Sequence, residues 1–67
     1  MNNIGKIIKE ERTQKKLTQE ELAKQIGVTQ DSISLWEQGK RIPDTQYIIL
    51  LCKVLEISSD YLLGLSE

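Results

Sequence analysis

Hydrogen-bonding side chains gather in the stretch 29–38 of this 67-residue chain, and the cations Lys40 and Arg41 follow it directly. The amide of Gln30 offers a donor and an acceptor at the spacing of adenine N6 and N7, which face the major groove of DNA. Cations beside such a stretch are well placed for phosphate groups, although a solvated loop would carry them too. These residue types favour contacts with DNA, and Gln30 is the best single candidate for reading a base.

Apolar spacing predicts that this stretch is the second helix of a helix-turn-helix, which we place at about residues 18–38. The buried faces of its two helices are marked by apolar pairs: Leu22 with Ile26, and Ile33 with Trp36. A spacing of three or four residues puts both members of a pair on one side of a helix. Gly27 can take the positive φ that ends the first helix and redirects the chain.

Capping residues indicate where these two helices begin and end. Thr18 and Glu21 match a capping box, a pattern that is specific for a helix start and silent about function. Thr29 is the expected N-cap of the second helix, which runs to about Gln38, with Gly39 as its left-handed C′ residue. The side of this helix away from the core is mostly polar. It carries Asp31, Ser34, Leu35 and Gln38, with Gln30 and Ser32 at its borders.

A first helix precedes the helix-turn-helix, with Ile4, Ile7 and Ile8 on its buried side. Arg12 falls four residues after Ile8, on or beside this buried side. Because an unpaired buried guanidinium is costly, Arg12 requires a partner.

Two C-terminal helices carry more apolar surface than one core requires. The longer helix is expected from an Asp44 cap through Leu55, and Ser58 or Ser59 caps the shorter one. Surplus apolar surface is more often an interface than an accident, so we expect a two-fold dimer surface at about residues 47–65. Its candidate residues, any of which could instead complete the small core, are Ile49, Leu50, Val54, Tyr61 and Leu65.

Composition limits the way in which the chain can bind DNA. Its length suits one domain, 1–67, with an efficiently packed core. The net charge of −1 and the pI of about 5.4 argue against binding through bulk positive charge. Any DNA binding must therefore come from the local placement of a few residues.

Composition also disfavours several other classes of protein. The chain has no histidine, and a single cysteine, Cys52, excludes an intramolecular disulfide. It shows no nucleophile–base constellation and is too short to enclose a substrate, so we expect no enzyme, cofactor, metal or small-molecule ligand. It has neither a signal-peptide pattern nor an apolar run of membrane-spanning length, so we expect a cytoplasmic protein without a membrane partner.

The pattern TQEELAKQIGVTQDSISLWEQGKRIP, followed by an apolar helix and SSDYLLG, resembles the phage Cro and repressor family of helix-turn-helix proteins, also called the xenobiotic-response-element family. The resemblance covers nearly the whole chain. It implies an all-α fold, a compact bundle of five short helices, which binds an operator in double-stranded DNA as a two-fold dimer.

The resemblance also implies roles for individual residues. The family's base-contacting positions fall here on Thr29, Gln30, Asp31, Ser34 and Leu35. Its phosphate-contacting positions fall on Gln19, Gln38, Lys40 and Arg41. The family's buried arginine–glutamate pair maps onto Arg12 and Glu37, which supplies the partner that Arg12 requires.

Two residues of the base-contacting set depart from the family pattern. Asp31 puts a carboxylate where many relatives have a neutral or basic side chain; it could accept from cytosine N4, but it also meets a polyanion. Leu35 cannot hydrogen-bond a base, and it could pack on a thymine methyl group or shield the rim of the core.

Two classes of function follow from these observations. The first is a sequence-specific transcriptional regulator, a repressor that binds a palindromic operator as a homodimer. The alternative is an antitoxin-like or other protein-interaction module that uses the apolar surface of the two C-terminal helices. The two are compatible, since a small regulator can also bind a regulatory protein partner. Glutamine, threonine and serine on the outer helix side, with cations beside them, favour DNA.

Overall fold

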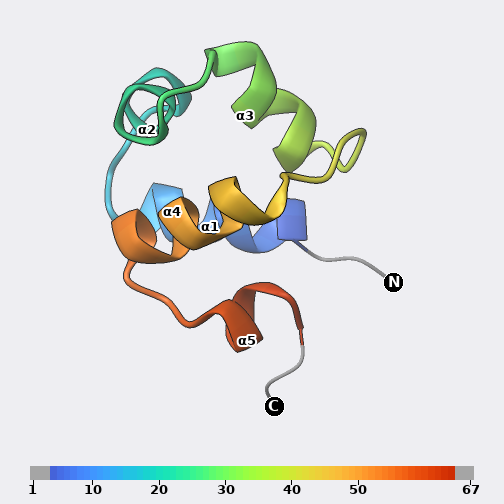
Figure 1. The fold of residues 1–67 in the computed structure, drawn as a ribbon. Helices are drawn as coiled ribbons and strands as arrows, with labels where there is room; N and C mark the ends of the chain where they lie inside the picture. Colours follow the sequence, from blue (N-terminus) through green and yellow to red (C-terminus); the bar gives the residue numbers. More distant parts are fainter. Residues whose placement is uncertain (1–3, 65–67) are drawn as a thin grey trace.

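The computed structural model describes residues 4–64, which form five α-helices and no strand (Figure 1). The helices are α1 (Ile4–Gln14), α2 (Gln19–Ile26), α3 (Gln30–Glu37), α4 (Thr45–Leu55) and α5 (Ser59–Leu62). The predicted all-α bundle of five short helices is therefore confirmed.

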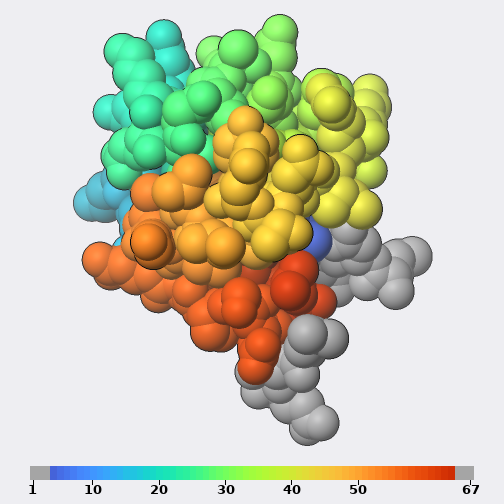
Figure 2. Space-filling view, in the orientation of Figure 1, coloured from blue at the N-terminus to red at the C-terminus, as the bar shows by residue number. Residues whose placement is uncertain are grey.

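A single core receives apolar side chains from every helix. Helices α2 and α3 lie at one end of the bundle, α1 and α4 pack in its middle, and α5 lies at the other end (Figures 1 and 2). The buried apolar residues are Ile4, Ile8, Leu22, Ala23, Ile26, Ile33, Trp36, Leu51, Leu55 and Leu62. Because α3 contributes only Ile33 and Trp36 to this core, its opposite side remains available for contacts outside the chain.

Local hydrogen bonds define α2 as predicted. The Thr18 hydroxyl accepts from the Glu21 N–H at 3.0 Å, and the Glu21 carboxylate accepts from the Thr18 N–H at 2.8 Å. Gly27 ends the helix with a φ of 88°, in the left-handed region that favours glycine. The capping box and the glycine turn that joins α2 to α3 are both confirmed.

Helix α3 follows the prediction with one small difference. Thr29 caps it by accepting from the Ser32 N–H at 3.2 Å, and Gly39 has the expected left-handed φ of 77°. The last helical residue is Glu37, and Gln38 is the C-cap, so the helix ends one residue earlier than expected.

Helix α4 follows Asp44 and ends at Leu55 as predicted, but the cap at its start is incomplete. Asp44 occupies the N-cap position, but its side chain makes no capping hydrogen bond, so the predicted Asp44 cap is wrong in this respect. At the other end, Glu56 takes a left-handed φ of 60° and forms an ion pair of 3.1 Å with Lys15. Ser58 rather than Ser59 caps α5, accepting from the Tyr61 N–H at 3.0 Å.

Gly5 allows α1 to pack closely against the end of α3. A Cβ atom at this position would overlap the Trp36 carbonyl oxygen and lie 2.8 Å from the Glu37 carbonyl oxygen. Both atoms belong to the backbone, which cannot move aside as a flexible side chain can. Gly5 therefore sets the distance between α1 and the last turn of α3.

None of the helices between residues 4 and 64 has the length and apolar character needed to cross a bilayer.

Candidate nucleic-acid interface

A shielded ion pair joins α1 to the end of α3. Arg12 Nε donates to Glu37 Oε2 at 2.7 Å, and Arg12 Nη2 donates to Glu37 Oε1 at 3.1 Å. The third guanidinium nitrogen, Nη1, donates to the Leu17 carbonyl at 2.7 Å. The two side chains are only 13% and 4% exposed. The hydrogen bond to Glu37 raises the pKa of Arg12, its Coulomb attraction adds to this, and partial burial opposes it.

Gln19 extends this pair toward the surface of α3. Its Nε2 donates to Glu37 Oε1 at 3.0 Å, and its Oε1 accepts from Gln30 Nε2 at 3.4 Å. A chain of hydrogen bonds thus runs from Arg12 through Glu37 and Gln19 to the exposed amide of Gln30. The phosphate-contacting role expected for Gln19 stays a prediction, because in the free chain this half-buried side chain bonds internally.

The five residues predicted to contact bases are the N-cap Thr29 and four residues of α3. Thr29, Gln30 and Asp31 are exposed, whereas Ser34 and Leu35 are half-buried. The Ser34 hydroxyl accepts from Gln38 Nε2 at 2.7 Å. The residues therefore lie together on one helix, but the Thr29 and Ser34 hydroxyls already hold hydrogen bonds within the chain.

Lys40 and Arg41 combine a fixed backbone with free charges. Their N–H groups both donate to the Leu35 carbonyl, at 3.0 and 3.3 Å, which ties the loop to the end of α3. Both side chains are exposed, and neither has a hydrogen-bond or ion-pair partner within residues 4–64. Within residues 4–64, two unneutralised cations thus follow the end of α3, an arrangement suited to phosphate groups.

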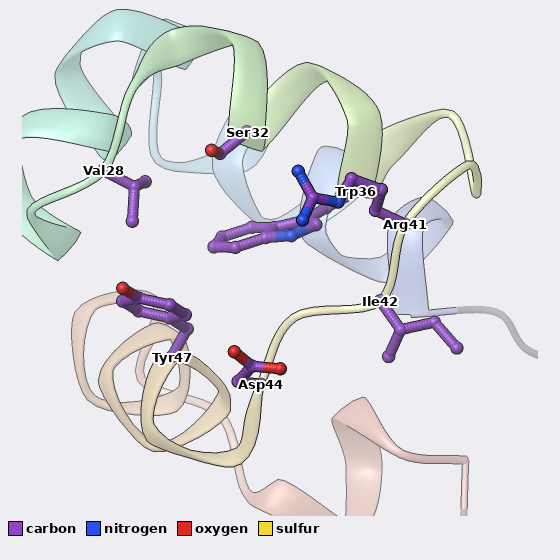
Figure 3. A pocket seen from close by; sticks show the side chains of 7 residues that line it. All are labelled: Val28, Ser32, Trp36, Arg41, Ile42, Asp44 and Tyr47. Carbon is purple, nitrogen blue, oxygen red and sulfur yellow. The ribbon is translucent and has the colours of Figure 1, made fainter.

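A surface cavity of about 280 Å³ lies between α3, the loop after it and α4 (Figure 3). Trp36 and Tyr47 contribute aromatic rings whose centroids are 5.7 Å apart. The other lining residues are Val28, Ser32, Arg41, Ile42 and Asp44. Asp44 thus holds the N-cap position of α4 as predicted, while its side chain lines this cavity and makes no capping hydrogen bond.

The residues predicted to form a dimer surface differ in their exposure. Ile49 is 51% exposed, Tyr61 41% and Leu50 37%. Val54 is half-buried and packs against the core, so it adds less free surface than expected. Leu65 lies outside the described residues.

Two exposed apolar residues were missed by sequence reasoning. Ile42 is 62% exposed and Leu63 is 42% exposed. A signal for Ile42 was available, because an isoleucine between Arg41 and Pro43 lies outside any helix and has no apolar face to join. Leu63 follows the last turn of α5, where a boundary error of one residue changes the predicted side of the helix.

Cys52 is a half-buried residue of α4, and burial raises the pKa of its thiol. Among residues 4–64, no group of three or more cysteine, aspartate or glutamate side chains is placed to hold a metal ion.

Comparison with known proteins identifies this arrangement. A family described as Helix-turn-helix matches residues 8–62. The chain is 41% identical over 56 residues to the HTH-type transcriptional regulator YqaE of Bacillus subtilis. The matched region covers 84% of this chain and 48% of YqaE. It is also 35% identical over 65 residues to the regulator ImmR of the same organism, and this matched region covers 97% of this chain and 51% of ImmR. The chain thus spans about half the length of these relatives.

A solved structure extends the similarity to three dimensions. The P22 c2 repressor protein in complex with a synthetic operator matches this chain with a TM-score of 0.87 and 37% identity, covering 90% of this chain and 91% of the repressor chain. The P22 repressor is a protein of a Salmonella phage. The resemblance to the phage Cro and repressor family is therefore confirmed, and the chain belongs to this family of helix-turn-helix proteins.

Proposed function

We propose that this chain is the DNA-binding domain of a transcriptional repressor, and that it occupies a two-fold symmetric operator as a homodimer. The observation that supports this most directly is the outer side of α3, which presents an ordered glutamine amide, hydroxyls and a carboxylate beside two free cations. The P22 c2 repressor, whose fold this chain shares, was solved in complex with a synthetic operator. The relatives reported above are named regulators or a repressor rather than enzymes.

In this proposal α3 enters the major groove, with Gln30 reading an adenine. The hydrogen bond from Gln30 to Gln19 supports this role, since it restricts the rotamers of a long side chain before DNA arrives. The other base-contacting candidates are Thr29, Asp31, Ser34 and Leu35. The hydroxyls of Thr29 and Ser34 can still act as donors or acceptors to a base while keeping their internal bonds.

Phosphate contacts supply the affinity that the net charge of −1 does not. Lys40 and Arg41 flank α3 with unpaired charges, so each is expected to neutralise about one phosphate. Replacing either with alanine should weaken binding to specific and random duplexes alike and reduce the salt slope by about one unit. Lys9→Ala, which removes an exposed cation of α1, is the matched control and should leave the slope unchanged.

Dimerisation supplies the selectivity that one short helix lacks. A single recognition helix spans few base pairs, and joining two half-site contacts makes the second effectively intramolecular. The exposed apolar residues Ile49, Leu50 and Tyr61 support a dimer surface on α4 and α5, within the region 47–65. A dimer axis there would set the two α3 helices about 34 Å apart, one turn of B-DNA.

Binding-site selection from random duplexes tests the proposal. The expected product is a palindrome with half-sites one helical turn apart, and sedimentation should give a dimer. Ile49→Glu should produce monomers and footprints with strongly reduced affinity. Gln46→Glu adds the same charge to an exposed polar position of α4, and this control should remain a dimer with the affinity of the parent. A parent chain that selects no sequence would refute the proposal.

The exposed apolar surface of α4 and α5 also favours a second function, the binding of a different protein. Sedimentation separates the two uses of this surface. If the parent stays monomeric at all concentrations and protects a single half-site with full affinity, the result would refute the homodimer and favour the binding of a different protein to this surface.

A further inference from the structure

Asp31 differs from every other hydrogen-bonding residue predicted to contact a base. Within the chain, Thr29 bonds to the Ser32 N–H, Gln30 bonds to Gln19, and Ser34 bonds to Gln38. The exposed Asp31 carboxylate has no hydrogen-bond or ion-pair partner within residues 4–64. It is therefore the one member of this set whose side chain forms no hydrogen bond with the described part of the chain.

A carboxylate restricts which base edge it can meet. It only accepts hydrogen bonds, and in the major groove the only donors are adenine N6 and cytosine N4. Beside adenine N6 lies the acceptor N7, which repels the second carboxylate oxygen. Beside cytosine N4 lies the C5–H group, which does not repel the second carboxylate oxygen. Guanine and thymine present acceptors at this edge and exclude the carboxylate.

We propose that Asp31 selects cytosine at one position of each half-site and lowers affinity for other duplexes. The second effect follows from its charge, which meets the phosphate backbone whether or not a cytosine is present. Asp31 thus raises the ratio of specific to random binding, because the hydrogen bond to cytosine offsets the repulsion only at the selected site. This inference rests on the proposed DNA binding and names the base that one residue of that surface reads.

The test uses the palindrome selected by the parent chain. In one arm, N4-methylcytosine replaces each cytosine of the half-site in turn. Its methyl group occupies the major-groove side of N4, so the groove-facing N–H is lost while the Watson–Crick pair is kept. At one position the parent should lose about tenfold in affinity, and Asp31→Ala should lose nothing there.

A second arm changes the side chain and repeats the selection. Asp31→Ala should lose the cytosine preference and bind random duplexes more tightly than the parent. Asp31→Asn should shift the preference at the same position toward adenine, since an amide can accept from N6 and donate to N7. Glu10→Ala removes one exposed carboxylate of α1 and is the matched control, with an unchanged selected site.

The outcomes separate this inference from the function on which it rests. If the parent selects a palindrome but Asp31→Ala and Asp31→Asn select the same one, DNA binding stands and the role of Asp31 is overturned. The same holds if N4-methylcytosine is tolerated everywhere. If the parent selects no duplex at all, both proposals fail together.

Discussion

The helix-turn-helix and the two C-terminal helices define their boundaries in different ways. Helix α2 begins at a complete capping box and ends at Gly27, which takes a left-handed φ at little cost. Helix α4 begins at Asp44 without a capping bond and ends at Glu56, which holds a φ of 60° in the same left-handed region. A non-glycine residue in that region costs about 1–3 kcal/mol. Local sequence therefore stabilises α2, whereas α4 depends more on its packing.

The exposed surfaces of the two regions differ in the same sense. On α3, polar side chains bond to each other and, through Gln19, to the shielded pair of Arg12 and Glu37. On α4 and α5, by contrast, apolar side chains such as Ile49 and Tyr61 are exposed. The first surface thus carries polar groups that are hydrogen-bonded within the chain, and the second exposes apolar area. Four substitutions test this contrast, in order of decreasing expected effect.

Arg12→Ala should break the ordered region most severely. The Glu37 side chain is only 4% exposed, so loss of Arg12 leaves a shielded carboxylate with an unpaired charge and only the hydrogen bond from Gln19, at a cost of about 3–5 kcal/mol in the free energy of unfolding. Urea unfolding measures this loss. Arg41→Ala removes an exposed guanidinium and should leave the midpoint nearly unchanged. An Arg12→Ala midpoint close to that of the parent would show that the pair does not stabilise the fold.

Gly5→Ala should disturb the same region through sterics alone. Alanine favours a helix by about 1 kcal/mol over glycine, but its Cβ would overlap backbone oxygens at the end of α3. Overpacking typically costs about 1–3 kcal/mol and occasionally more, and an overlap with two backbone oxygens belongs at the upper end, so we expect a net loss of about 2 kcal/mol or more. The midpoint of thermal unfolding measures this loss. Lys6→Ala, which changes an exposed neighbouring residue of α1, is the control. A gain in stability for both variants would mean that α1 can move away from α3 without cost.

Gln30→Ala should remove recognition while sparing the fold. The expected loss is about 1–3 kcal/mol on the selected operator, with relaxed preference at one base pair. Competition binding against duplexes altered at single positions measures it. Gln46→Ala, at an exposed glutamine of α4, is the control. An equal loss for Gln30→Ala on every duplex would argue against base reading by this side chain.

Glu56→Gly tests the contrast between the ends of α2 and α4, and the free-energy change that we expect from it is the smallest among the four substitutions. Relief of the left-handed strain is offset by loss of the exposed Lys15–Glu56 pair, which contributes about 0–1 kcal/mol, and by the conformational freedom that glycine loses on folding, about 0.5–1 kcal/mol. We expect a net gain of about 1 kcal/mol or less in the free energy of unfolding. The reciprocal change, Gly27→Ala, should destabilise, although its Cβ would meet no atom within 4 Å. A loss of stability for Glu56→Gly would contradict this account.

Predictions from sequence held best where the interacting residues are neighbours in the chain. Thr18 and Glu21 are three residues apart, and each reaches only the other's backbone, so their spacing is sufficient to predict the bond. Asp44 shows the limit of this approach. Its type and position suit an N-cap, but its side chain lines the cavity between α3 and α4, which depends on how the two helices pack.

The sequence by itself determined the positions of the helices, their buried faces and the residues on the outer side of α3, because these follow from helical periodicity and local capping. Only the tertiary structure decided that Gln19 links Glu37 to Gln30, that Gly5 lies against the end of α3, and that Val54 packs inward while Ile42 does not. Each of these depends on the crossing angles and distances between helices. Such geometry results from the packing of all the core side chains together, so no local pattern encodes it.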